Sequence, residues 1–107
     1  MSNNPQSKIR YVVFHVPGEK WQKGVDFREQ KGIAEHAAYY MQYNQMGKLE
    51  MGGPFTDADR GGMMVAVAGV TREELDDYAS KDPAVKSGLL HYEIVEWYLP
   101  FAKSEDE

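Results

Sequence analysis

The order of strand-like and helical patterns is the feature that most restricts the fold of this chain. A run rich in β-branched and aromatic residues, 9–16, is followed by a helical pattern from about residue 26 to Gly47. Two more strand-like runs, 48–51 and 63–70, precede a shorter helical pattern, and a last run, 90–98, ends before Pro100. Thr71 and Glu74 have the spacing of a capping box, which predicts that Thr71 caps the shorter helix. This β-α-β-β-α-β order predicts an α+β ferredoxin-like domain, in which the helices cover one face of a four-stranded, largely antiparallel sheet.

The long helical pattern carries a stripe of mostly apolar side chains on one face, with a histidine beside it. Asp26 and Glu29 have capping-box-like spacing, so we expect the helix to begin there. His36 precedes Tyr40 by four positions, at the edge of the buried face, where a side chain can be desolvated and still reach a pocket. The predicted buried stripe consists of Ile33, Ala37, Tyr40, Met41 and Asn44.

A glycine- and proline-rich stretch separates the second and third strand-like runs. Gly53 and its neighbour Gly52 allow a close approach of other groups, while Pro54 stiffens the turn and removes a hydrogen-bond donor. This stretch predicts a loop that forms one wall of a pocket between the helices. The alternative is a hairpin with a decorated loop and no further role.

The apolar side chains of the first and last strand-like runs exceed what two helices can cover. An exposed apolar sheet face usually marks an interface. The sequence therefore predicts a homodimer through the open sheet face, whereas a monomer would need the loop around Trp21 and the C-terminal tail to cover it. The side chains concerned are Tyr11, Val13, Ile94, Val95, Trp97 and Tyr98.

Length and composition limit the domain count and the partners. A chain of 107 residues supports one domain, expected over 9–100, between a disordered N-terminal tail over 1–8 and an acidic tail over 101–107. The net charge is −5 and the basic residues are scattered, so we expect no nucleic-acid partner. We expect no membrane segment because no long apolar window exists. The absence of cysteine and of a secretion signal fits a cytoplasmic protein.

The candidate chemistry centres on histidine. His15 and His91 fall in strands, where a half-exposed histidine is the default expectation, and the histidine spacing matches no metal-ligand motif. No nucleotide-binding motif is present, so we expect neither a metal nor a cofactor. His36 and Asp82 can meet at one end of the sheet as a general-base pair. Asp82 could instead serve only as a helix cap, since Pro83 follows it and Gly88 ends the turn.

Several short motifs, taken together in their order along the chain, resemble the YCII-related (YciI-like) family across about residues 9–99. The motifs are Ala34-Glu35-His36, Gly47-Lys48-Leu49, Gly53-Pro54-Phe55, Gly61-Gly62-Met63, Asp82-Pro83-Ala84-Val85 and Glu93-Ile94 with Trp97. The resemblance implies a ferredoxin-like dimeric α/β barrel and an active site centred on His36 and Asp82. It also implies that Ser87 lines the pocket and helps to bind an anionic group. A segment over 19–26 that bears Trp21 departs from shorter members.

Two functions fit these residues. The first is a cofactor-independent lyase or isomerase that transfers a proton on a small aromatic or enolisable substrate, with dehydrochlorinase-like chemistry as the family example. Its catalytic residues would be His36 and Asp82, and its substrate-binding residues Ser87, Gly53, Pro54, Phe55 and Tyr40. The second is a non-catalytic dimeric domain that binds or senses a small molecule. A cofactor-free monooxygenase is a third option, based on fold analogy alone.

Overall fold

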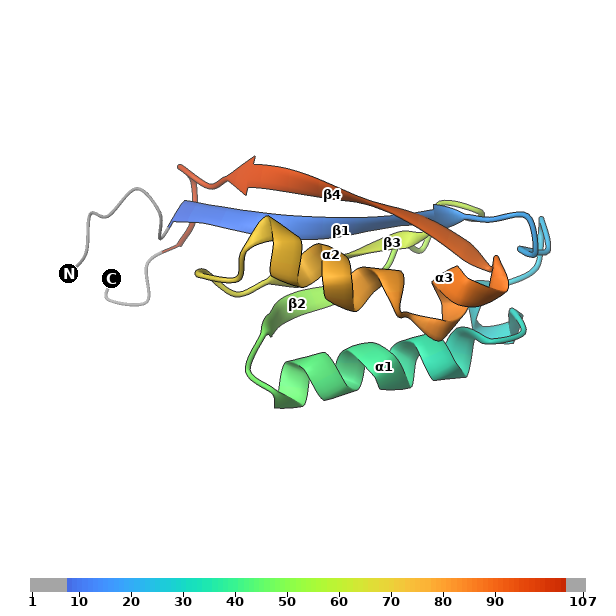
Figure 1. The fold of residues 1–107 in the computed structure, drawn as a ribbon. Coiled ribbons are helices and arrows are strands. Elements are labelled where there is room, and N and C mark those ends of the chain that lie inside the picture. The colour runs from blue at the N-terminus through green and yellow to red at the C-terminus, as the bar shows by residue number, and fades with distance from the viewer. Residues whose placement is uncertain (1–7, 104–107) are drawn as a thin grey trace.

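The computed structural model describes residues 8–103, so the tails expected over 1–8 and 101–107 fall mainly outside the described part. Figure 1 shows helices packed along one face of a twisted sheet. The elements in chain order are β1 (Ile9–Pro17), the 3₁₀ helix η2 (Phe27–Glu29), α1 (Ile33–Gln45), β2 (Leu49–Pro54), β3 (Gly62–Ala66), α2 (Arg72–Ser80), α3 (Pro83–Ser87) and β4 (Leu90–Tyr98).

The four strands form one antiparallel sheet in the order β2-β3-β1-β4. β1 lies between β3 and β4, with Val12 opposite Val65 on one side and opposite Val95 on the other. The predicted α+β ferredoxin-like fold is confirmed, and the first strand takes a central position in the sheet. Within the described residues, no helix is both long enough and apolar enough to span a membrane.

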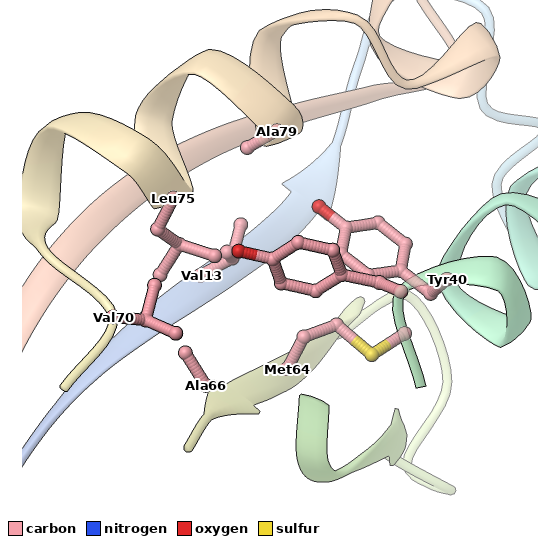
Figure 2. Packing of buried hydrophobic residues seen from close by; sticks show 8 residues of the cluster. Val13, Tyr40, Met64, Ala66, Val70, Leu75 and Ala79 are labelled. Atoms are coloured by element: carbon pink, nitrogen blue, oxygen red, sulfur yellow. The ribbon is translucent and has the colours of Figure 1, made fainter. Parts of the chain in front are cut away.

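The core lies between this sheet and the helices. Figure 2 shows Leu75 and Ala79 of α2 directed towards Val13 of β1 and the strands beside it. Each large apolar side chain buried in this way contributes roughly 1.5–3 kcal/mol to stability. The buried cluster consists of Val13, Tyr40, Tyr43, Met64, Ala66, Val70, Leu75 and Ala79.

The start of the long helix differs from the prediction. Asp26 caps the short helix η2, because its carboxylate accepts a 2.8 Å hydrogen bond from the Arg28 backbone N–H. α1 begins only after Gly32, whose φ of 99° breaks the helical path between the two segments. In contrast, Thr71 caps α2 as predicted by accepting a hydrogen bond from the Glu74 backbone N–H.

The glycine-proline stretch also differs from the prediction. Gly52, Gly53 and Pro54 belong to β2 and pair with β3, so the loop lies beyond them, at 55–61. β2 is an edge strand, where the missing N–H of Pro54 is tolerated. β3 ends at Ala66, earlier than the apolar run that continues to Val70.

The sheet face away from the helices carries apolar side chains, of which Val12 and Val65 are buried, Val95 is half-buried and Trp97 is exposed. Because side chains alternate along a strand, Val12, Val65 and Val95 lie opposite the helix-facing Val13. Trp97 follows Val95 on this outer face and is 41% exposed. The apolar set singled out in the sequence therefore divides: Tyr11, Val13 and Ile94 pack with the core, and Val95 and Trp97 face outward.

Candidate functional site

A cavity of about 440 Å³ lies between α1 and the strands β2 and β3. Of the helix stripe predicted to be buried, Tyr40 packs into the core, and the stripe as a whole forms the helix wall of this cavity. Met41 in this stripe is 56% exposed, whereas the side chains that α1 buries are His36, Tyr40 and Tyr43. The stripe residues that line the cavity are Ile33, Ala37, Tyr40, Met41 and Asn44.

The lining of the cavity is mostly apolar. His15, His36, Tyr40 and Asn44 supply its polar side-chain atoms, and none of its lining residues is Lys, Arg, Asp or Glu. The apolar remainder includes the side chains of Trp21, Phe27, Ile33, Met41, Leu49, Met51, Pro54, Met63, Met64 and Leu90. Such a cavity suits a small, largely apolar ligand with a few polar groups.

His36 and Asp82 meet at the inner end of this cavity. His36 Nδ1 lies 2.6 Å from Asp82 Oδ2, and Asp82 is completely buried. The other carboxylate oxygen, Oδ1, accepts a 2.9 Å hydrogen bond from the Ala84 backbone N–H and caps α3. Asp82 therefore serves both as the helix cap and as the partner of His36, which the sequence had left as alternatives.

The contact with Asp82 determines which histidine nitrogen is free. A carboxylate only accepts hydrogen bonds, so the proton of a neutral His36 ring lies on Nδ1 and points towards Asp82. The remaining nitrogen, Nε2, then carries a lone pair. Because His36 lines the cavity, this lone pair is the basic group that its ring can offer to a ligand.

His15 is a second histidine at this point, and the sequence reasoning missed it. We expected a half-exposed strand residue, but His15 is 2% exposed and its ring lies edge-on to that of His36, with 4.7 Å between centroids. Its position two residues after Val13, on the helix-facing side of β1, was the signal that could have placed it there. Burial, together with His36, lowers the pKa of His15 to about 4.

The position of His15 leaves one polar atom without a protein partner. Its Nε2 is buried, makes no hydrogen bond and lies 3.6 Å from Asp82 Oδ2. The carboxylate of Asp82 thus lies between two imidazole rings, of which only His36 is hydrogen-bonded to it. His91 lies outside this group, on the surface, and pairs with Glu19 at 2.9 Å.

The expected substrate-binding residues divide into two groups. Gly53, Pro54 and Tyr40 line the cavity. The Tyr40 ring packs against both histidine rings, its hydroxyl is buried without a partner, and burial and the Asp82 carboxylate raise its pKa. Ser87 lies outside the lining, since its hydroxyl bonds the Ala84 carbonyl and the Leu89 N–H within the turn. Phe55 lies in a separate shallow depression beside the loop over 55–61.

The segment around Trp21 forms part of the cavity wall. The Trp21 indole N–H donates a 2.8 Å hydrogen bond to Asp59 Oδ1, which joins this segment to the loop after β2. Asp59 also accepts from the Gly24 N–H, and these bonds lower its pKa. The buried Gln30 side chain bonds the backbone of the same segment and fixes its course.

The comparison with known proteins agrees with this architecture. No curated protein matches the sequence. A family model for the YCII-related domain matches residues 9–98, which include all strands of the sheet and all helices packed on it in the described structure. The match also contains the His36–Asp82 pair and the cavity. The chain therefore belongs to the YCII-related family.

Proposed function

We propose that this protein is a cofactor-independent enzyme, a lyase or isomerase, that transfers a proton on a small aromatic or enolisable substrate. The observation that carries the proposal is the 2.6 Å contact between His36 Nδ1 and the buried Asp82 carboxylate, at the end of an apolar cavity. A histidine oriented in this way by a carboxylate has the arrangement of a general base.

The reaction would use the two residues in different roles. A C–H or O–H group of the substrate loses its proton to Nε2 of His36, and the electron pair remains on the substrate. Asp82 holds the ring orientation and stabilises the imidazolium that forms. In an isomerisation the proton returns to another atom of the substrate; in a dehydrochlorination, chloride leaves with the electrons of the C–Cl bond and the proton passes to solvent.

The substrate class follows from the cavity. Apolar walls from Trp21 and Phe27 fit an aromatic or short aliphatic body, with Tyr40 beside the histidines and Gly53 and Pro54 at the sheet edge. The lining supplies no Lys or Arg, so a phosphate or a carboxylate would lose its hydration without a cationic partner. A neutral phenol or ketone fits best.

The test is hydrogen exchange in D₂O. A panel of phenols, chlorinated phenols and enolisable ketones is incubated with metal-free protein, and ¹H NMR records deuterium incorporation at carbon and loss of substrate signals. The proposal expects exchange or turnover with at least one compound, reduced roughly 10²- to 10⁴-fold in His36→Gln. The control is His91→Gln, which changes an exposed histidine outside the cavity.

A different pattern would favour the alternative function. If a compound raises the melting temperature without exchange or turnover, the protein is a binding or sensing domain, since ligand binding stabilises the native state by mass action. Equal exchange in wild type and His36→Gln would assign proton transfer to another group and overturn the proposal.

We also propose that the protein acts as a homodimer through the outer sheet face. The support is the exposed Trp97 and the half-buried Val95, on a face that the chain's own helices do not cover; Val12 and Val65 on the same face are already buried within the chain. Two such faces would bury each other and form the barrel that the family resemblance implies. The cavity lies on the helix side of the sheet, so each protomer would retain its own.

A further inference from the structure

The most unusual group of side chains in the described structure is the set His15, His36 and Asp82. All three are buried, and each offers one ligand atom, with all these atoms within 4.8 Å of one another. We propose that this set is a binding site for a divalent transition metal such as Zn²⁺. The ligands would be His15 Nε2, His36 Nδ1 and Asp82 Oδ2.

The first argument is the unpartnered nitrogen of His15. Nε2 is buried without a hydrogen bond and faces the Asp82 carboxylate at 3.6 Å. A buried polar atom without a partner costs roughly 1–3 kcal/mol, and such groups in native proteins usually have a ligand, an ion or a functional role. A metal between this nitrogen and the carboxylate would give it a partner.

The second argument is the donor set. Two imidazole nitrogens and one carboxylate oxygen form a common ligand set for Zn²⁺, and three protein ligands leave a further position open. His15 and His36 both line the cavity, so the open position and the entry path would lie on the cavity side.

The third argument is the separation of the ligand atoms. Two ligands at about 2.1 Å from a tetrahedral ion lie roughly 3.4 Å apart, close to the 3.6 Å between His15 Nε2 and Asp82 Oδ2. The 2.6 Å between His36 Nδ1 and the same oxygen is shorter, because a proton now joins these atoms. Metal binding would therefore widen this contact by less than about 1 Å. All three ligand atoms already lie within 4.8 Å of one another, so the remaining adjustment is within reach of side-chain movement.

Metal binding would have a chemical consequence that rests on the proposed function. The metal replaces the proton on Nδ1 of His36, and that proton moves to Nε2, so the neutral ring changes tautomer without a net gain or loss of protons. Nε2 then donates a hydrogen bond and no longer has a lone pair for a substrate proton. The metal-bound form would lack the general base, and the metal would inhibit proton transfer.

The binding test needs no substrate. Metal-free protein is titrated with Co²⁺, and the visible absorption reports occupancy and geometry; Zn²⁺ displacement of the Co²⁺ gives the zinc affinity. We expect one ion per chain in a tetrahedral or five-coordinate spectrum. His15→Gln is expected to weaken binding at least about tenfold, in line with the loss of a metal ligand. This variant retains the His36–Asp82 contact.

His91→Gln is the matched control, because it removes a histidine of the surface and not of the cluster. Absence of binding in the wild type would overturn the proposal. So would binding that His15→Gln leaves unchanged, since the ion would then lie elsewhere. Failure of either kind leaves the deuterium-exchange test in metal-free protein unaffected, so the two proposals fail separately.

The tautomer is measured independently by long-range ¹H–¹⁵N NMR of the His36 ring with diamagnetic Zn²⁺. We expect the proton on Nδ1 in metal-free protein and on Nε2 after one equivalent of Zn²⁺. An unchanged proton position at full zinc occupancy would exclude His36 as a ligand and overturn the assigned set.

Discussion

Tyr39 on α1 and Tyr78 on α2 exchange hydrogen bonds: each hydroxyl donates to the backbone carbonyl of the other, at 2.7 and 2.5 Å. Their rings stack with 4.2 Å between centroids. The pair joins the helix that carries His36 to the helix that precedes Asp82. It therefore fixes the spacing of the two elements on which the candidate site depends.

The tyrosine pair predicts a measurable loss of stability. Tyr39→Phe and Tyr78→Phe each remove one hydrogen bond to a partly buried carbonyl and should lower the free energy of unfolding by about 1 kcal/mol. Urea unfolding measures this. Tyr98→Phe is the control, because that side chain is 57% exposed, and it should remain within about 0.5 kcal/mol of wild type. Equal effects at all three positions would contradict a specific role for the pair.

A substitution at Asp82 should separate its role in capping α3 from its proposed role in proton transfer. Asp82→Asn retains an oxygen that can cap α3, but its amide replaces the charge that stabilises the His36 imidazolium. We expect this variant to remain folded by circular dichroism and to lose proton transfer by roughly 10²- to 10⁴-fold.

Asp82→Ala is the matched comparison, because it removes both interactions. It should lose stability by about 1 kcal/mol or more beyond Asp82→Asn, as the cap is lost as well. If Asp82→Asn transfers protons at the wild-type rate, the carboxylate has no part in the reaction beyond the cap.

Two glycines beside the cavity predict opposite outcomes for the same substitution. A Cβ at Gly61 would lie 1.9 Å from the His15 carbonyl oxygen, and Gly61 has a φ of +80° that side chains disfavour. Gly61→Ala should therefore cost about 2 kcal/mol or more. A Cβ at Gly53 meets nothing within 4 Å, so Gly53→Ala should change stability by less than about 0.5 kcal/mol. Thermal melts of both variants measure these changes, and Gly61→Ala should have the lower melting temperature.

His15 predicts a pH dependence of stability in metal-free protein. Folding lowers its pKa from 6.5 to about 4, so the unfolded chain binds more protons than the native state between these values. The free energy of unfolding is therefore at its full value above about pH 6.5. It falls by about 3 kcal/mol as the pH decreases towards 4, because the unfolded chain takes up a proton that the native state does not.

Urea unfolding at pH 7 and pH 4.5, with EDTA, measures the effect. The wild type should lose more stability over this interval than His15→Gln, in which this group no longer titrates. The other acidic groups contribute to both proteins and largely cancel in the comparison. An equal loss in both would show that His15 titrates normally in the native state.

The outer sheet face predicts the association state. Val95→Glu would bury a charge in the proposed interface, which is costly without a partner, and should yield a monomer by size-exclusion chromatography with light scattering. Met46→Glu introduces the same residue at an exposed position after α1 and should leave a dimer intact. A monomeric wild type at tens of micromolar would reject the proposed interface.

The sequence predicted the element order and several exact ends of elements, because these depend on local chemistry. Thr71 and Asp82 cap helices in the structure as their spacing indicated. The predicted start of α1 was wrong because Asp26 caps the short helix η2, and the positive φ of Gly32 that separates η2 from α1 cannot be read from its neighbours. The pairing of His36 with Asp82 was anticipated, because the predicted topology brings these two residues to the same end of the sheet.

What the sequence could not provide is which side chains face the cavity. The helix stripe with Met41 has the spacing of a buried face, but of this stripe α1 buries only Tyr40, together with His36 and Tyr43 outside it. His15 has the spacing of the helix-facing side of β1, yet its burial depends on how α1 crosses the sheet. The buried face of α1 and the burial of His15 both depend on packing between elements that are distant in sequence, which the periodicity of one element does not specify.

The two oxygens of Asp82 affect how relatives of this protein can be classified. One oxygen caps α3 and the other holds His36, so a relative without the proposed chemistry would still favour a capping side chain such as Asp, Asn, Ser or Thr here. An aspartate at this position in another sequence is therefore a marker of the fold. His36 makes no such structural cap, so under the proposed mechanism the histidine is the residue whose presence or absence would separate active relatives from inactive ones.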